Sequence, residues 1–214
     1  MAMVSKADCK KVHLMKDTAD NQTEEIIRAF SKVRGATFKQ IAESFGFENS
    51  GACKRWLDGQ VRAGVLEVAN HFVSPLPDLS TPLLEWAPGD NSPADFESVA
   101  YQCRKRLDGQ AFEVAIYCLS QKAANALGVW VAKIAPGQAT HDLAVTQVYL
   151  NHFLKNNAWQ LEDENRGEGK RPDATITNEA GQTVAIEFAG KYSATRLAAF
   201  HGACKASGTP YLMY

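Results

Sequence analysis

The sequence predicts an α+β protein in two parts: a small helical domain with a β-hairpin, then a larger α/β domain with a mixed sheet. Three short segments near the start have apolar residues at helical spacing. The segment 87–93 is dense in turn-forming residues and marks a boundary near residue 90. Beyond it, helical and strand patterns follow one another as in an α/β layer. We therefore expect domains at residues 1–90 and 91–214.

The composition is that of a folded globular protein. Of 214 residues 45% are hydrophobic, and the formal net charge is −1, so any contact with nucleic acid must come from local basic patches. Five widely spaced cysteines without a C-x-x-C pair argue against a zinc site or disulfides. The N-terminus has no apolar signal region, and no run reaches membrane-spanning length. We expect a soluble, cytoplasmic protein with no membrane partner.

Three helices are expected in the first domain, after a flexible lead-in that ends near residue 18. The first has Thr23 as its N-cap and ends near residues 34–35. The second is short, capped by Thr37 and stopped by Gly46, and the third begins at Ser50 and is closed by Gly64. This succession, within about forty residues, is typical of a helix-turn-helix.

Two short strands, 65–69 and 83–86, follow and are expected to pair around a proline-bearing loop. Three helices and such a hairpin make a winged helix, whose third helix would face double-stranded DNA. The cations expected to contact DNA are Lys54, Arg55 and Arg62 on the third helix, with Lys39 or His71 at phosphates. Alternatively, the winged helix serves protein contacts and these cations are a solvated face, which the nearby acids Asp58 and Glu67 favour.

The second domain is expected to open with a helix over 94–107, a strand over 112–119 and a short helix over 120–127. A polar loop then leads to a helix with Thr140 as N-cap and with His141 and Asp142 in its first turn. The helix dipole stabilises a carboxylate there, so Asp142 has a structural explanation as well as a functional one. A lone histidine is more often a surface residue than a ligand.

The last third of the chain predicts a β-hairpin between other elements. The expected strands and helix are, in order, 159–162, 173–177, 184–189, 193–206 and 210–214. The loop before the hairpin is rich in charge and glycine, and its cations Lys170 and Arg171 come directly before the first hairpin strand.

Two carboxylates are predicted to meet on this hairpin. A three-residue loop over 179–181, with Gly181 in the left-handed conformation, places Asp173 directly opposite Glu187. A slip of one residue would put them on opposite faces. Paired carboxylates repel each other unless a cation or proton lies between them. Mg²⁺ or Mn²⁺ is the expected occupant, since Mg²⁺ takes oxygen ligands and usually only one or two protein carboxylates.

At Pro172-Asp173, Glu187 and Lys191 the sequence resembles the PD-(D/E)xK superfamily, whose core is a helix, a hairpin bearing the acids, another helix and a strand. The resemblance implies a restriction-endonuclease-like, mixed-sheet α/β fold for the second domain. Members usually carry lysine two residues after the second acid. Here Ala189 occupies that position and Lys191 lies two further on, so the catalytic lysine is displaced or the site is inactive.

The whole chain also resembles the MobC-like, replication-relaxation family of plasmid mobilisation proteins. The segments that carry the resemblance are 86–90, 140–143, 171–174, 187–190 with Tyr192, and 197–201. It implies a relaxase or relaxosome component in conjugation, which binds the plasmid origin of transfer and has a relaxosome protein as partner. A homodimer is compatible with it.

Together the resemblances and the carboxylate pair imply metal-assisted cleavage of a phosphodiester. The expected metal ligands are Asp173, Glu187 and Asp142. His141 would approach from the same helix start as Asp142, and Lys191 would stabilise charge or orient the nucleophile. Lys170 and Arg171 would hold the flanking backbone.

Tyr192 is an alternative nucleophile, because some relaxases attack with tyrosine, although an aromatic residue at a strand end more often serves packing. A different reading is a noncatalytic DNA-binding accessory protein or transcriptional regulator, which Ala189 favours. A nuclease of defence or recombination is a third alternative.

Overall fold

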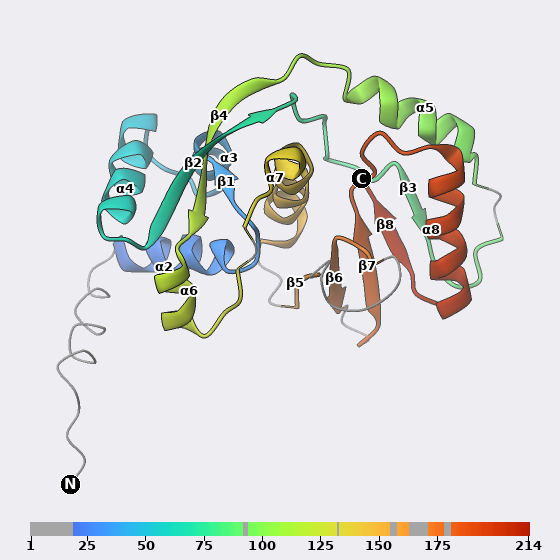
Figure 1. The fold of residues 1–214 in the computed structure, drawn as a ribbon. Helices are drawn as coiled ribbons and strands as arrows, with labels where there is room; N and C mark the ends of the chain where they lie inside the picture. The colour runs from blue at the N-terminus through green and yellow to red at the C-terminus, as the bar shows by residue number, and fades with distance from the viewer. Residues whose placement is uncertain (1–18, 92–93, 132, 155–157, 163–170, 178–180) are drawn as a thin grey trace, which may run out of the picture.

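The chain forms two β-sheets, and helix α7 (Ala139–Val148) lies between them (Figure 1). This computed structural model describes residues 19–91, 94–131, 133–154, 158–162, 171–177 and 181–214. The architecture is mixed α/β, as predicted, with one antiparallel sheet and one mixed sheet. Each sheet contains strands from both sides of residue 90.

The first sheet is antiparallel, with the order β1-β4-β2. Its strands are β1 (Ala36–Thr37), β4 (Phe112–Leu119) and β2 (Leu66–Val73). β2 and β4 pair along their whole length, from Leu66 opposite Leu119 to Val73 opposite Phe112. Helices α2 (Ala19–Phe30), α3 (Phe38–Ser44) and α4 (Ser50–Arg62) bury their apolar side chains in one core with Leu66 and Leu119. The short helix α6 (Gln121–Leu127) follows β4.

The second sheet is mixed, with the order β3-β8-β7-β6-β5. Its strands are β3 (Leu84–Trp86), β8 (Tyr211–Met213), β7 (Thr183–Glu187), β6 (Ala174–Thr177) and β5 (Gln160–Leu161). β7 and β8 are parallel and the other neighbours antiparallel, so a crossover is needed between β7 and β8, and α8 (Ala194–Ser207) supplies it. α5 (Phe96–Arg106) lies beside α8 (Figure 1).

Apolar residues cover both faces of the second sheet. Ile186 and Phe188 belong to the core that includes α7 residues Val145 and Val148. Ala185 and Ala189 point into a second core with residues of α5 and α8, among them Leu197. β7 is therefore buried on both faces, and the sheet forms the middle of three layers.

The predicted hairpin of strands 65–69 and 83–86 is wrong. β2 pairs with β4, and β3 pairs with β8 in the other sheet. The chain therefore leaves the first sheet after β2. Segment 74–111 contributes β3 and α5 to the layers of the second sheet, and the chain then returns to the first sheet in β4.

Helix boundaries agree in part with the predicted caps. Thr37 forms a capping box with Gln40, and Gly64 has the positive φ of 70° that closes α4. Thr23 is not an N-cap, because α2 begins at Ala19, and its hydroxyl accepts a hydrogen bond from Trp56 Nε1 instead. Thr140 is not one either: α7 begins one residue earlier, after the 3₁₀ turn Pro136–Gln138.

Within the described residues, no helix has the length and apolarity needed to cross a membrane.

Candidate functional site

A cleft of about 420 Å³ opens where α7, the β6–β7 hairpin and the start of α8 meet. Five residues predicted as site residues line it, namely His141, Asp142, Arg171, Asp173 and Glu187, and so does Tyr192, the alternative nucleophile. Side chains that were not predicted complete its wall, among them Arg34, Glu162 and Arg196. The cleft therefore combines carboxylates with several cations.

Asp173 directly precedes β6, and the hairpin has the predicted register. Ala174 pairs with Ile186 and Thr177 with Thr183, so the register continues to Asp173 opposite Glu187. Gly181 has the predicted positive φ, 76°, whereas residues 179–180 of the loop lie outside the described residues. Asp173 Oδ2 accepts a hydrogen bond of 2.6 Å from Phe188 N, which fixes the carboxylate against the end of β7.

Glu187 is buried, with 5% of its surface exposed. Its Oε1 accepts a 2.7 Å hydrogen bond from the Tyr192 hydroxyl, and its Oε2 has no hydrogen-bond partner among the described residues. Burial, and then the charge of Asp173, raise the pKa of Glu187 to about 8. In the absence of a bound metal ion, Glu187 therefore holds a proton at neutral pH.

His141 lies between two carboxylates. Its Nε2 is 3.2 Å from Asp173 Oδ1, and its Nδ1 is 3.8 Å from Asp142 Oδ1. Burial lowers the pKa of His141, but the two carboxylates outweigh burial and raise the pKa to about 10. The imidazole ring also contacts the Phe188 ring edge-on. His141 is thus a site cation rather than a surface residue.

Asp142 is held by a residue far away in the sequence. Its Oδ1 accepts a 3.0 Å hydrogen bond from Arg34 Nη1, and its side chain is only 3% exposed. Asp142 Oδ2 is buried without a hydrogen-bond partner among the described residues. The ion pair explains why a charge is tolerated at this buried position.

The cations of the cleft agree only in part with those predicted. Lys191 is exposed and is not among the lining residues, and Ala189 is fully buried. Arg171 lines the cleft, with Nη1 3.8 Å from Glu162 Oε2, whereas Lys170 lies outside the described residues. Arg196, in the first turn of α8, donates a 2.7 Å hydrogen bond to the Tyr192 hydroxyl and stacks on its ring.

Tyr192 is buried and its hydroxyl donates to Glu187. Burial, the charge of Glu187 and this hydrogen bond raise the pKa of Tyr192 well above its usual range. A hydroxyl with a raised pKa is a poor nucleophile at neutral pH. The environment of Tyr192 therefore fits a role in orienting Glu187 better than a role as a phenolate nucleophile.

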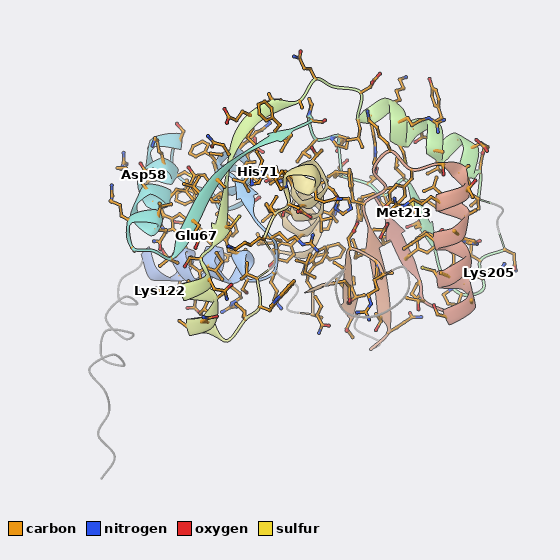
Figure 2. The ribbon with its side chains drawn as sticks, in the orientation of Figure 1. Asp58, Glu67, His71, Lys122, Lys205 and Met213 are labelled. Atoms are coloured by element: carbon orange, nitrogen blue, oxygen red, sulfur yellow. The ribbon has the colours of Figure 1, made fainter. Side chains whose placement is uncertain are left out.

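The cations predicted for DNA contact lie on the surface of α3 and α4. Lys54, Arg55 and Arg62 are exposed along α4. Lys54 forms an ion pair of 2.9 Å with Asp58, and Lys39 on α3 lies 3.9 Å from Glu43. His71 is on β2, farther along the strand than Glu67 (Figure 2). Asp58 reduces the field of Lys54, as expected from the sequence, and Glu43 reduces that of Lys39.

Arg34, Glu162 and Arg196 were not predicted as site residues. Arg34 and Asp142 are 108 positions apart, and no local pattern indicates that they meet. The sequence does contain a local indication for Arg196. It is a cation three residues after the N-cap Ser193, at a helix position where an acid or glutamine is preferred.

No group of three or more His, Cys, Asp or Glu side chains in metal-binding geometry occurs in the part of the chain that the structure describes. Comparisons of the chain with models of protein families, with curated proteins and with solved structures find no match.

Proposed function

We propose that the protein binds double-stranded DNA and cleaves one strand by metal-dependent phosphodiester hydrolysis in the cleft. The observation that carries the proposal is Glu187: a buried carboxylate with one oxygen lacking a hydrogen-bond partner among the described residues, beside the carboxylate of Asp173. An arrangement of this kind destabilises the fold unless a cation or a proton compensates it.

The carboxylates fit a hard divalent metal. Mg²⁺ and Mn²⁺ prefer oxygen ligands, and Mg²⁺ usually binds one or two protein carboxylates and keeps several waters. Asp173 and Glu187 would hold the ion, and Asp142 would contribute its second oxygen from α7. When bound, such an ion polarises a phosphodiester and activates water.

The residues around the carboxylates have separate roles in this proposal. Tyr192 donates to Glu187 Oε1 and so fixes the orientation of that carboxylate. His141, which is protonated at neutral pH, adds positive charge next to Asp173. Arg171 lies where the flanking DNA backbone would pass along the cleft.

Two topological features support the nucleic-acid assignment. The order α2-β1-α3-α4-β2-β4, with β4 between β1 and β2, is what we would expect of a winged helix in which residues 74–111 replace the wing loop. The order α7-β5-β6-β7-α8-β8 agrees with a restriction-endonuclease-like core, with the acids on the hairpin. We assign DNA targeting to α4 and strand cleavage to the cleft, in plasmid mobilisation at an origin of transfer as a relaxosome component.

Nicking of supercoiled plasmid DNA tests the cleavage proposal. With Mn²⁺ or Mg²⁺, the wild type is expected to convert plasmid carrying the cognate origin to the open-circular form, and Glu187→Gln to lower the rate at least about a hundredfold through loss of metal chemistry. Lys122→Gln, on the exposed surface of α6, is the control and should nick normally. Equal rates for Glu187→Gln and the wild type would remove this cleft from the mechanism.

A noncatalytic DNA-binding accessory protein is the second candidate. It is favoured by Ala189 at the usual lysine position and by His141, which already neutralises Asp173. Calorimetric titration with Mn²⁺ distinguishes the two: heat that disappears in Glu187→Gln supports cleavage, and DNA binding without any heat from Mn²⁺ supports the accessory role.

A further inference from the structure

Arg196 stands at a position that helix stability does not explain. Ser193 is the N-cap of α8 and its hydroxyl accepts from Arg196 N, so Arg196 is the third residue of the helix. Acids are preferred there because they complement the positive end of the helix dipole, and glutamate and glutamine because they can complete a capping box. A cation at this position weakens the helix slightly, and local conflicts of this kind are expected at functional sites.

The guanidinium of Arg196 is held in place although the residue is exposed. Nη2 donates a 2.7 Å hydrogen bond to the Tyr192 hydroxyl, and the guanidinium carbon lies 3.7 Å from the centre of the Tyr192 ring. The same hydroxyl donates to Glu187 Oε1, so Glu187, Tyr192 and Arg196 form a chain of hydrogen bonds. An arginine has five N–H donors, and this contact with Tyr192 uses one of them.

The position of Arg196 in the cleft also suits a contact with a phosphate bound there. It lines the cleft together with Asp173, Glu187 and Gly190, whereas Lys191 does not line it. A planar guanidinium that is already oriented suits two parallel hydrogen bonds to phosphate oxygens.

We propose that Arg196 is the cation that contacts the phosphodiester in the cleft, in the role for which a lysine is lacking at Ala189. The ligand class is a backbone phosphate of DNA, and Arg196 donates to its non-bridging oxygens while Tyr192 keeps the guanidinium in position. The assignment of this phosphate as the one that is cleaved rests on the proposed function, and the contact itself does not.

The salt dependence of DNA binding tests the contact. The probe is a fluorescein-labelled duplex of mixed sequence, titrated with the full-length protein in buffer without divalent metal and followed by anisotropy at several salt concentrations. Arg196→Gln is expected to raise Kd about tenfold and to reduce the slope of log Kd against log salt by about 0.9, the loss of one phosphate contact. Because glutamine is preferred at this helix position, a loss of helix stability cannot produce the result.

Three further variants sharpen the test. Arg196→Lys should keep most of the slope, and Lys205→Gln, an exposed cation in the last turn of the same helix (Figure 2), should leave slope and Kd unchanged. The proposal is overturned if Arg196→Gln keeps the wild-type slope, if Lys191→Gln lowers the slope instead, or if the wild type does not bind the duplex. If Arg196→Gln has a lower slope but the wild type does not nick DNA in Mn²⁺, the phosphate contact of Arg196 is supported and the cleavage proposal is rejected.

Discussion

Glu187 holds a proton at neutral pH because the fold buries it next to Asp173. The pKa is raised from 4.5 to about 8, so the folded state binds this proton more tightly than the unfolded chain does. The resulting stability is fully present below about pH 4.5 and is lost as the pH rises through about 8.

Glu187→Gln should therefore stabilise the metal-free protein at alkaline pH, since glutamine has a similar shape and does not ionise. We expect little difference from the wild type near about pH 4.5, and an advantage of at least about 1 kcal/mol above about pH 8, roughly 2–4 °C in Tm. Thermal melts across this range, with chelator present, measure it. A constant difference at all pH values would contradict the raised pKa.

His141 contributes a pH dependence of the same sign in a different window. Its pKa is raised from 6.5 to about 10, so the stability it provides is lost as the pH rises through about 10. His141 is present in both proteins, so comparing Glu187→Gln with the wild type isolates Glu187.

The sequence predicts some of these residue environments and not others. The pairing of Asp173 with Glu187 followed from strand alternation and one loop, because both act over a few residues. The raised pKa of His141 depends on two carboxylates, of which only Asp142 is its neighbour in sequence. The contact of Arg34 with Asp142 arises from packing of distant segments and has no local pattern.

At the scale of elements, the turn of the β6–β7 hairpin determines which side chains face the cleft. Gly181 has φ 76°, a conformation that L residues rarely adopt, and an added Cβ would meet no atom of the described residues within 4 Å apart from its chain neighbours. The need for glycine here is therefore conformational and not steric.

Two glycine substitutions with opposite effects test the turn. Gly181→Ala should destabilise the protein by about 1 kcal/mol, because the Cβ of alanine makes the left-handed conformation unfavourable. Gly202→Ala, within α8 and also free of clashes, should stabilise it by about 0.5–1 kcal/mol. Urea unfolding measures both, and destabilisation by the two substitutions alike would contradict the conformational explanation.

Elements were easier to predict than their partners. Strand 112–119 and the helix ending near residue 206 occur nearly as expected, because hydrophobic period and turn residues are local signals. The strand pairing was wrong, since β2 skips β3 and pairs with a strand that lies beyond the intervening segment 74–111. Neighbouring strands often pair, but an inserted segment breaks that rule without changing either strand's own pattern.

Across the whole molecule, the contact between Arg34 and Asp142 joins the first sheet's region to α7 and the cleft. The two side chains are 13% and 3% exposed. Further contacts between the same parts run from Gln40 Nε2 to the carbonyl of Leu143, and from the Thr146 hydroxyl to the carbonyl of Gly35. The N-terminal helices and the cleft therefore share one rigid junction.

A double-mutant cycle measures this junction. Arg34→Met or Asp142→Leu alone should cost about 3–5 kcal/mol, because each removes one partner of a buried ion pair, whereas the double variant should lie close to the wild type. Arg28→Met, which breaks the exposed pair with Glu24, should change stability by no more than about 0.5 kcal/mol. Additive losses in the double variant, measured by denaturant unfolding, would contradict a coupled buried pair.

The central position of β8 has a consequence for how the chain is made. A ribosome synthesises the chain from the N-terminus, and all three strands of the first sheet exist once Leu119 has left the exit tunnel. The second sheet forms later, because among the described strands β3 and β7 are joined only through β8, which follows both of them in the chain. During translation β3 therefore stays without its partner β8 while more than half of the 214 residues are synthesised, and the sheet that carries Glu187 is joined to β3 only after β8 has emerged.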